Sequence, residues 1–91
     1  MEKIWWVYIL RCGDGTFYTG VTTDVAARLE THRSGNGAKY TRSRGPLTLV
    51  YTEKCEDKVS AFQREYAIKQ LKRAQKEALC AAWKENNPRS E

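Results

Sequence analysis

The segment from Ile4 to Arg11 most constrains how this chain can fold, because it is apolar on both faces that a strand would present. Alternate residues of a strand point to opposite sides of the sheet, and β-branched and aromatic residues favour strands. The two alternating sets are Ile4, Trp6, Tyr8 and Leu10 on one face, and Trp5, Val7 and Ile9 on the other. The segment is therefore predicted to be a central strand that is covered on both sides.

A hairpin and a helix are predicted directly after this strand. Residues 12–15, Cys-Gly-Asp-Gly, supply turn chemistry, and residues 16–21 are predicted to form the returning strand. Residues 22–24, Thr-Thr-Asp, offer N-caps for a helix that runs to about Ser34. Gly35 suits the C-terminal end of that helix.

The second half of the chain is predicted to hold a loop, a strand and two helices. Glycines make residues 35–46 a loop, and residues 47–55 alternate strongly enough to form a third strand. Asp57 can cap a helix from residue 58 to about 72, and strong helix formers occupy residues 74–85. The order β-β-α-β-α-α indicates an α/β (α+β) fold with a small three-stranded antiparallel sheet flanked by helices.

Ninety-one residues are enough for one small domain, which we expect to span residues 1–85 and to be followed by a flexible tail at 86–91. A second lobe with its own substrate pocket is not expected, so function should lie on an exposed face. No apolar run approaches the ~18 residues that a membrane span requires, and the N-terminus lacks a signal-peptide pattern. The expected location is the cytoplasm, without membrane attachment.

The charge of the chain favours a polyanionic partner without naming one. Sixteen lysines and arginines against eleven aspartates and glutamates give a formal net charge of +5, a balance that nucleic-acid-binding domains share with other basic domains. Cys12, Cys55 and Cys80 are far apart and show neither zinc-ligand spacing nor a disulfide framework. Three reduced thiols in a cytoplasmic protein are expected.

Two tyrosines on neighbouring predicted strands are candidates for chemistry. Tyr8 and Tyr18 are expected on faces that meet across the hairpin. Gly20 shares the face of Tyr18 and carries no side chain, so a phosphate or another backbone could come close there. The structural alternative is that both tyrosines are core aromatics with their hydroxyls at the rim.

Arg28 and His32 are the candidates on the first predicted helix. They lie one turn apart, so both can point at the edge of the sheet, and His32 is the only histidine in the chain. The structural alternatives are a surface pair between Asp24 and Arg28 and an interaction of His32 with the helix C-terminus.

Glu65 is the candidate on the second predicted helix, on the face that also carries Ala61, Phe62 and Ile68. That face would half-bury its carboxylate. Lys69, four residues later, offers a structural explanation as a helix ion pair. Magnesium offers a functional one, because it commonly takes one or two protein carboxylates and completes its octahedron with water and substrate phosphate.

A segment before the third predicted strand interleaves cations with an aromatic and small polar residues. This composition suits phosphate contacts and stacking on an unpaired base, although a solvated charge run is the alternative. The candidate nucleic-acid contacts are Arg33, Lys39, Tyr40, Thr41, Arg42 and Arg44.

This ordered set of residues resembles the GIY-YIG nuclease family, and in particular its short stand-alone members. Val-Tyr-Ile at residues 7–9 stands for the first family triplet and Tyr-Thr-Gly at residues 18–20 for the second, within a resemblance that covers roughly residues 5–79. The catalytic positions that the resemblance implies are Tyr8, Tyr18, Arg28, His32 and Glu65. The resemblance also implies that the first strand is central. The basic segment Lys-Tyr-Thr-Arg at residues 39–42 is typical of the short members.

The resemblance implies a divalent-metal-dependent endonuclease that hydrolyses DNA phosphodiester bonds, in a setting such as DNA repair. One Mg²⁺ or Mn²⁺ ion would be held by Glu65, and Arg28 would stabilise charge on the phosphate. A free phenol has a pKa of about 10, so Tyr8 would need His32 to accept its proton before acting as a base. The sequence leaves open which tyrosine is the base and which is the organiser.

Three departures from the family pattern favour a different class of function. Val21 stands where some members have a lysine, no residue matches a late asparagine of some branches, and no separate DNA-binding domain is seen. The alternative is a catalytically weak or inactive module that binds nucleic acid or protein. An active enzyme could instead select branched or nicked DNA and take its targeting from a protein partner. Substrate preference, pathway and oligomeric state do not follow from the sequence.

Overall fold

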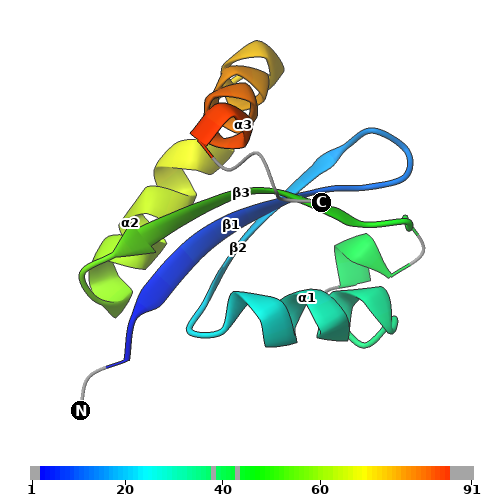
Figure 1. Cartoon of the computed structure of the whole chain (residues 1–91), viewed down its shortest axis with the longest axis horizontal. Helices are drawn as coiled ribbons and strands as arrows, with labels where there is room; N and C mark the ends of the chain where they lie inside the picture. The colour runs from blue at the N-terminus through cyan, green and yellow to red at the C-terminus, as the bar shows by residue number, and fades with distance from the viewer. Residues whose placement is uncertain (1–2, 38, 43, 87–91) are drawn as a thin grey trace.

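A three-stranded antiparallel sheet forms the centre of the protein, in a computed structural model that describes residues 3–37, 39–42 and 44–86. Strand β1 (Trp5–Arg11) lies between β2 (Phe17–Thr22) and β3 (Thr48–Cys55), as Figure 1 shows. The prediction of a central first strand is therefore confirmed. The order β-β-α-β-α-α is confirmed as well.

Helix α1 (Val25–Arg33) lies on one side of the sheet, whereas α2 (Lys58–Lys69) and α3 (Arg73–Asn86) pack on the other (Figure 1). Asp24, one of the three candidate N-caps, caps α1, and Asp57 caps α2 as predicted. Each accepts a hydrogen bond from a backbone N–H in the first turn. None of the helices in the described ranges is long and apolar enough to cross a membrane.

The main differences from the sequence prediction lie in the second half of the chain. Helix α2 ends at Lys69 rather than near residue 72, and α3 begins at Arg73, where the side chain of Gln75 accepts a hydrogen bond from the Lys72 N–H. The predicted loop before β3 contains a short 3₁₀ helix, η1 (Lys39–Thr41), which sequence reasoning missed. Of the predicted tail, Asn86 is the last residue of α3, and residues 87–91 lie outside the described part of the chain.

The two faces of β1 carry two separate cores. Val7 and Ile9 pack with residues of α2, α3 and β3, and Tyr8 and Leu10 pack with Cys12 and Leu47 on the α1 side. A register shift between Ile9 and Leu10 pairs them with Tyr51 and Leu49 of β3. This bulge places two β3 residues that are two apart in opposite cores, Tyr51 in the first and Leu49 beside the second.

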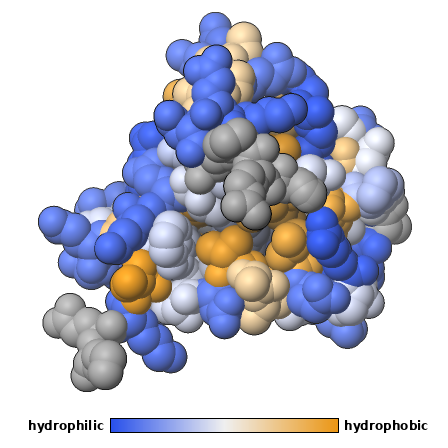
Figure 2. All heavy atoms as spheres, in the orientation of Figure 1, coloured by the Kyte–Doolittle hydropathy of each residue, from blue (hydrophilic) through white to orange (hydrophobic). Residues whose placement is uncertain are grey.

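The face of the molecule seen in Figure 2 is largely hydrophilic, with hydrophobic side chains gathered in its middle, between α3 and α1. The core residues of β1 from Val7 to Leu10 contribute almost nothing to the molecular surface, because each is at most 3% exposed. The apolar side chains that made the central strand predictable are thus buried in the interior.

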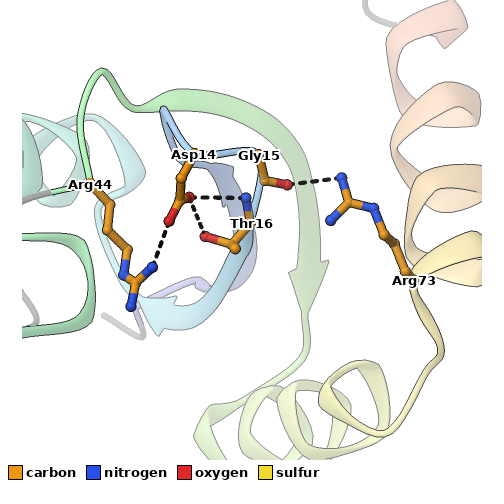
Figure 3. Close-up of polar contacts among 5 residues, drawn as sticks. All are labelled: Asp14, Gly15, Thr16, Arg44 and Arg73. Carbon is orange, nitrogen blue, oxygen red and sulfur yellow. Dashed lines mark hydrogen bonds and ion pairs between the residues drawn. The ribbon is translucent and has the colours of Figure 1, made fainter.

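The turn between β1 and β2 is held from two sides (Figure 3). Asp14 accepts hydrogen bonds from Thr16 and forms an ion pair with Arg44, in which Oδ2 lies 2.6 Å from Nη1. Those interactions, the Thr16 hydrogen bonds first, lower the pKa of the Asp14 carboxyl to about 2. On the opposite side, Arg73 donates to the carbonyl oxygen of Gly15 at 2.8 Å. The turn therefore links the segment before β3 to the start of α3.

Tyr8 and Gly20 are direct cross-strand partners, and the tyrosine lies across the glycine. A Cβ atom added to Gly20 would lie 2.5 Å from the hydroxyl oxygen and 2.6 Å from Cζ of Tyr8. Gly20 is therefore required here for space, because any larger side chain would displace the phenol.

We expect Gly20→Ala to destabilise the protein by about 1–3 kcal/mol, the usual cost of overpacking a filled interior. Denaturant unfolding followed by circular dichroism would measure the free-energy change. Thr48→Ala, at an exposed position of β3, is the control and should change stability by less than about 0.5 kcal/mol. Equal stability of Gly20→Ala and the parent would mean that Tyr8 moves aside without cost.

Candidate active site

A buried hydrogen bond between Tyr8 and His32 forms the centre of the candidate site. The Tyr8 hydroxyl lies 2.9 Å from Nε2 of His32, and the two residues are 3% and 2% exposed. Tyr8 comes from the middle of β1 and His32 from the last turn of α1, so the contact joins the sheet to that helix. The Tyr8 hydroxyl is therefore engaged by a side chain of α1.

Tyr18 completes a cluster of three rings. Its ring centroid lies 6.3 Å from that of Tyr8 and 5.2 Å from that of His32, in tilted arrangements. The expectation that the two tyrosines meet across the hairpin is consistent with this geometry, since Tyr18 is paired with Leu10, two residues along β1 from Tyr8. Tyr18 is half-buried, so it lies between the Tyr8–His32 pair and the surface.

The second ring nitrogen of His32 is also engaged. Nδ1 lies 2.9 Å from Oγ1 of Thr41, a residue of η1 that is 1% exposed. Gly37 packs directly on the imidazole, because a Cβ atom added there would collide with Nδ1. Sequence reasoning assigned Thr41 to nucleic-acid contacts and did not consider Gly37. A glycine and a hydroxyl residue shortly after the only histidine were the available signals.

Arg28 lies one turn before His32 on α1 and is exposed. Its positive charge lowers the pKa of both Tyr8 and His32, which places it within electrostatic reach of the buried pair. In the described part of the chain Asp24 caps the helix and forms no ion pair with Arg28. The surface pair considered from the sequence is therefore not formed.

Glu65 lies on α2, which packs on the side of the sheet opposite α1. Helix α2 contacts both β1 and β2, and the Glu65 carboxylate raises the pKa of Tyr8 by its charge. Its side chain is 17% exposed, and Oε2 lies 3.1 Å from Nζ of Lys69. The half-buried position and the helix ion pair considered from the sequence are thus both present.

The electrostatic surroundings favour neutral forms of the central pair. Burial, reinforced by Tyr18 and Glu65, raises the pKa of Tyr8 well above its usual value despite Arg28. Burial and then the charge of Arg28 lower the pKa of His32. A neutral imidazole beside a phenol is an acceptor for the phenolic proton, so the pair can act as a proton relay.

A divalent cation at this centre would have few protein ligands. Among the described residues, no group of three or more histidines, cysteines, aspartates or glutamates could hold a metal. Glu65 supplies one carboxylate, and the magnesium ion commonly needs only one or two, with water and substrate phosphate as its remaining ligands. The donor set fits a hard cation that is bound together with substrate.

The six predicted nucleic-acid contacts separate into different environments. Arg33 donates to the carbonyl oxygen of Leu47 from Nε at 3.3 Å and from Nη2 at 3.1 Å, and Arg44 pairs with Asp14. Thr41 lies in the interior, whereas Lys39 and Arg42 are exposed; the side chain of Tyr40 lies outside the described part of the structure. Arg33 is exposed as well, so three cations of the set are presented to solvent, although Arg33 and Arg44 also hold the Leu47 carbonyl and Asp14.

Comparisons with known proteins identify the family of this chain. The family model described as the GIY-YIG catalytic domain matches residues 4–78. A UPF0213 protein of Halobacterium salinarum is 60% identical over 73 residues, which cover 80% of this chain and 95% of that protein. A UPF0213 protein of Desulfotalea psychrophila is 54% identical over 79 residues, 86% of this chain and 72% of that protein.

A solved structure shares the fold at high sequence identity. The solution structure of a UPF0213 protein from Bacillus halodurans is 51% identical, with a TM-score of 0.56, and the match covers 87% of this chain and 84% of that one. The fold assignment therefore has experimental counterparts.

Substitution of Arg28 tests the electrostatic coupling inside this site. We expect Arg28→Gln to raise the pKa of His32 toward its usual value, because the neighbouring positive charge is removed. NMR titration of the single histidine measures that pKa directly. Arg28→Lys keeps the charge and is the control. An unchanged pKa in Arg28→Gln would show that burial sets the titration of His32 without Arg28.

The same lowered pKa predicts how stability depends on pH. As pH falls below about 6.5, the ordinary pKa of histidine, the unfolded chain binds the proton before the folded one. His32 should therefore reduce the free energy of unfolding between that pH and its lower folded-state pKa, and contribute no further change below it. Unfolding of the parent and of His32→Gln across this range separates the histidine from other titrating groups.

Proposed function

Because the chain belongs to the GIY-YIG family, whose domain suggests nuclease activity in general, we propose that it is a divalent-metal-dependent endonuclease acting on DNA. The observation that carries the proposal is the buried hydrogen bond between the Tyr8 hydroxyl and Nε2 of His32, with the Tyr18 ring beside both. His32 bonds to that hydroxyl, and the charges of Arg28 and Glu65 both act on it. A phenol in this position is suited to removing a proton from an attacking water.

In the proposed reaction Tyr8 is the general base and His32 takes up its proton. The Tyr8 hydroxyl passes its proton to Nε2 of His32 as it gains one from the attacking water, whose oxygen then bonds to phosphorus. The phosphorus bond to the leaving sugar oxygen breaks, and that oxygen takes a proton from solvent water. Tyr18, beside both rings, organises the pair.

Arg28 and Glu65 serve the phosphate in this proposal. Arg28 is exposed one turn from His32, so its guanidinium can neutralise charge that develops on the phosphate. Glu65 would hold one Mg²⁺ or Mn²⁺ ion, which would supply charge neutralisation at the phosphate when bound. The ion pair of Glu65 with the half-exposed Lys69 is worth at most about 1 kcal/mol, so it offers little resistance to an incoming cation.

Lys39 and Arg42 are the proposed contacts to DNA outside the reacting phosphate, since both are exposed on the segment that follows α1. Arg33 and Arg44 support this segment and the start of β3 through Leu47 and Asp14. A few exposed cations give modest affinity. The proposal therefore includes selectivity for branched or nicked DNA and a protein partner that adds affinity.

One observation favours the alternative of a weakly active or inactive interaction module. Val21 follows the second family triplet and packs against the core on the α2 side, where some family members place a lysine. The site thus lacks a cation at that position. Turnover by the purified protein separates the two functions.

Substitution of Glu65 tests the metal-dependent step. Glu65→Gln keeps the shape of the side chain and removes the charge that a divalent cation requires, so cleavage should fall by roughly 10²-fold or more. Cleavage of nicked, branched and linear DNA with magnesium or manganese is the measurement. Thermal unfolding of the variant checks that the fold is retained.

Glu77→Gln is the matched control, because Glu77 forms the corresponding ion pair with Arg73 on α3, at 2.8 Å, away from Tyr8. It should cut as fast as the parent. If Glu65→Gln is equally fast at every magnesium concentration, Glu65 is a partner of Lys69 and not a metal ligand. A parent protein that binds DNA but cleaves none of these structures would favour the interaction module.

The exposed cations are tested by the salt dependence of DNA binding. Replacement of Lys39 and Arg42 by alanine should reduce the slope of log affinity against log salt by about 0.7 to 0.9 for each true phosphate contact. Fluorescence anisotropy over a range of salt gives the slope. A double alanine variant of Lys72 and Lys84, two exposed lysines that are not proposed contacts, is the control. If the Lys39 and Arg42 variant leaves the slope unchanged while the Lys72 and Lys84 variant reduces it, the surface that contacts DNA lies at α3 and the residue before it instead.

A further inference from the structure

We propose that Thr41 is a positioning residue that holds His32 in the tautomer with the proton on Nδ1, so that Nε2 faces Tyr8 as an acceptor. This inference rests on the proposed function for its catalytic consequence, and on the geometry of the buried side chains for the tautomer itself. It removes Thr41 from the predicted nucleic-acid contacts and gives it a role inside the protein.

Both ring nitrogens of His32 have hydroxyl partners at the same distance. Nε2 lies 2.9 Å from the Tyr8 hydroxyl, and Nδ1 lies 2.9 Å from the Thr41 hydroxyl. A neutral imidazole has one N–H and one bare nitrogen, so one of the two hydroxyls must donate to the ring and the other must accept from it. All three residues are at most 3% exposed, which makes an unsatisfied arrangement costly.

The acidity of the two hydroxyls decides which one donates. A phenol, with a pKa of about 10, is a far stronger hydrogen-bond donor than an aliphatic alcohol and a weaker acceptor through its oxygen. The better pairing therefore lets Tyr8 donate to Nε2 and lets Thr41 accept from Nδ1–H. In that tautomer the bare nitrogen already faces the proton that the reaction must move.

The backbone around Thr41 keeps its hydroxyl in place. Its carbonyl oxygen accepts a hydrogen bond from the Arg44 N–H at 3.2 Å, and the Arg42 N–H bonds back to the Lys39 carbonyl at 3.2 Å within η1. Gly37, which follows α1, packs against the imidazole of His32, and only a residue without a side chain leaves room for the ring there. The histidine is thus fixed by the chain that follows it.

The arrangement also serves the protonated state. When the proton of Tyr8 moves to Nε2, the ring becomes an imidazolium with both nitrogens protonated, and Thr41 continues to accept from Nδ1–H. No rotation of the ring is needed. In the other tautomer Nε2 would already carry a hydrogen, and Tyr8 could not pass its proton to that nitrogen.

Nitrogen NMR of the single histidine tests the tautomer directly, because the two ring nitrogens have different chemical shifts when one is protonated. The parent should show protonated Nδ1 and bare Nε2 at neutral pH. Thr41→Val keeps the shape but removes the acceptor, so the population should shift toward the Nε2–H form. Thr41→Ser restores the hydroxyl and should return the parent spectrum.

Kinetics measure the consequence for the proposed reaction. Thr41→Val should lower kcat by about 10- to 100-fold, the effect typical of partners that orient a functional histidine, with KM and DNA affinity unchanged. In a Tyr8→Phe background it should cause no further loss. Thr31→Val is the matched control, since Thr31 lies on α1 beside His32 and its hydroxyl bonds to the Ala27 carbonyl instead.

The outcomes distinguish this inference from the proposed function. A parent spectrum with Nε2 protonated would overturn the role of Thr41, and it needs no variant, so a Thr41→Val protein that fails to fold does not prevent the test. An unchanged tautomer in folded Thr41→Val would overturn it as well. A parent with the expected tautomer that cleaves no DNA would support Thr41 as the positioning residue and overturn the nuclease.

Discussion

Burial of β1 on both faces is the constraint on which the rest of the structure depends. A strand that is apolar on alternate sides needs a cover on each, and α1 supplies one while α2 and α3 supply the other. The chain must therefore place helices on opposite sides of one thin sheet. This arrangement lets groups from two layers act on one phenol in the middle of the strand, His32 from α1 and Glu65 from α2.

The buried polar pair is stable because its atoms have partners. No buried side-chain nitrogen or oxygen in the described residues lacks a hydrogen bond, although Tyr8, His32 and Thr41 all lie in the interior. Burial raises the pKa of the phenol and lowers that of the imidazole, so the resting proton belongs on Tyr8. Arg28 opposes part of this effect on Tyr8. The same burial that stabilises the resting pair opposes transfer of the phenolic proton to His32, so in the proposed reaction Tyr8 must gain a proton from water in the same step.

Cations near the site divide between structure and solvent. Arg44 and Arg73 hold the β1–β2 turn (Figure 3). Arg33 holds the Leu47 carbonyl just before β3. A net charge of +5 therefore overstates the charge that is free to meet a phosphate. The exposed Lys39 and Arg42 lie next to the segment that these contacts fix, so a DNA surface there would be supported by an ordered backbone.

The sequence by itself determined the features that depend on local patterns. Apolar residues on both faces identified the central strand, candidate capping residues identified the helix starts, and the ordered motif identified the family. The tertiary structure alone decided which side chains became partners across the chain. Thr41 turned inward to His32 and Arg44 to Asp14, over separations of 9 and 30 residues. The reason is physical: strand period and capping act within a few residues, whereas a side-chain partner is chosen by the packing of elements that no local pattern places together.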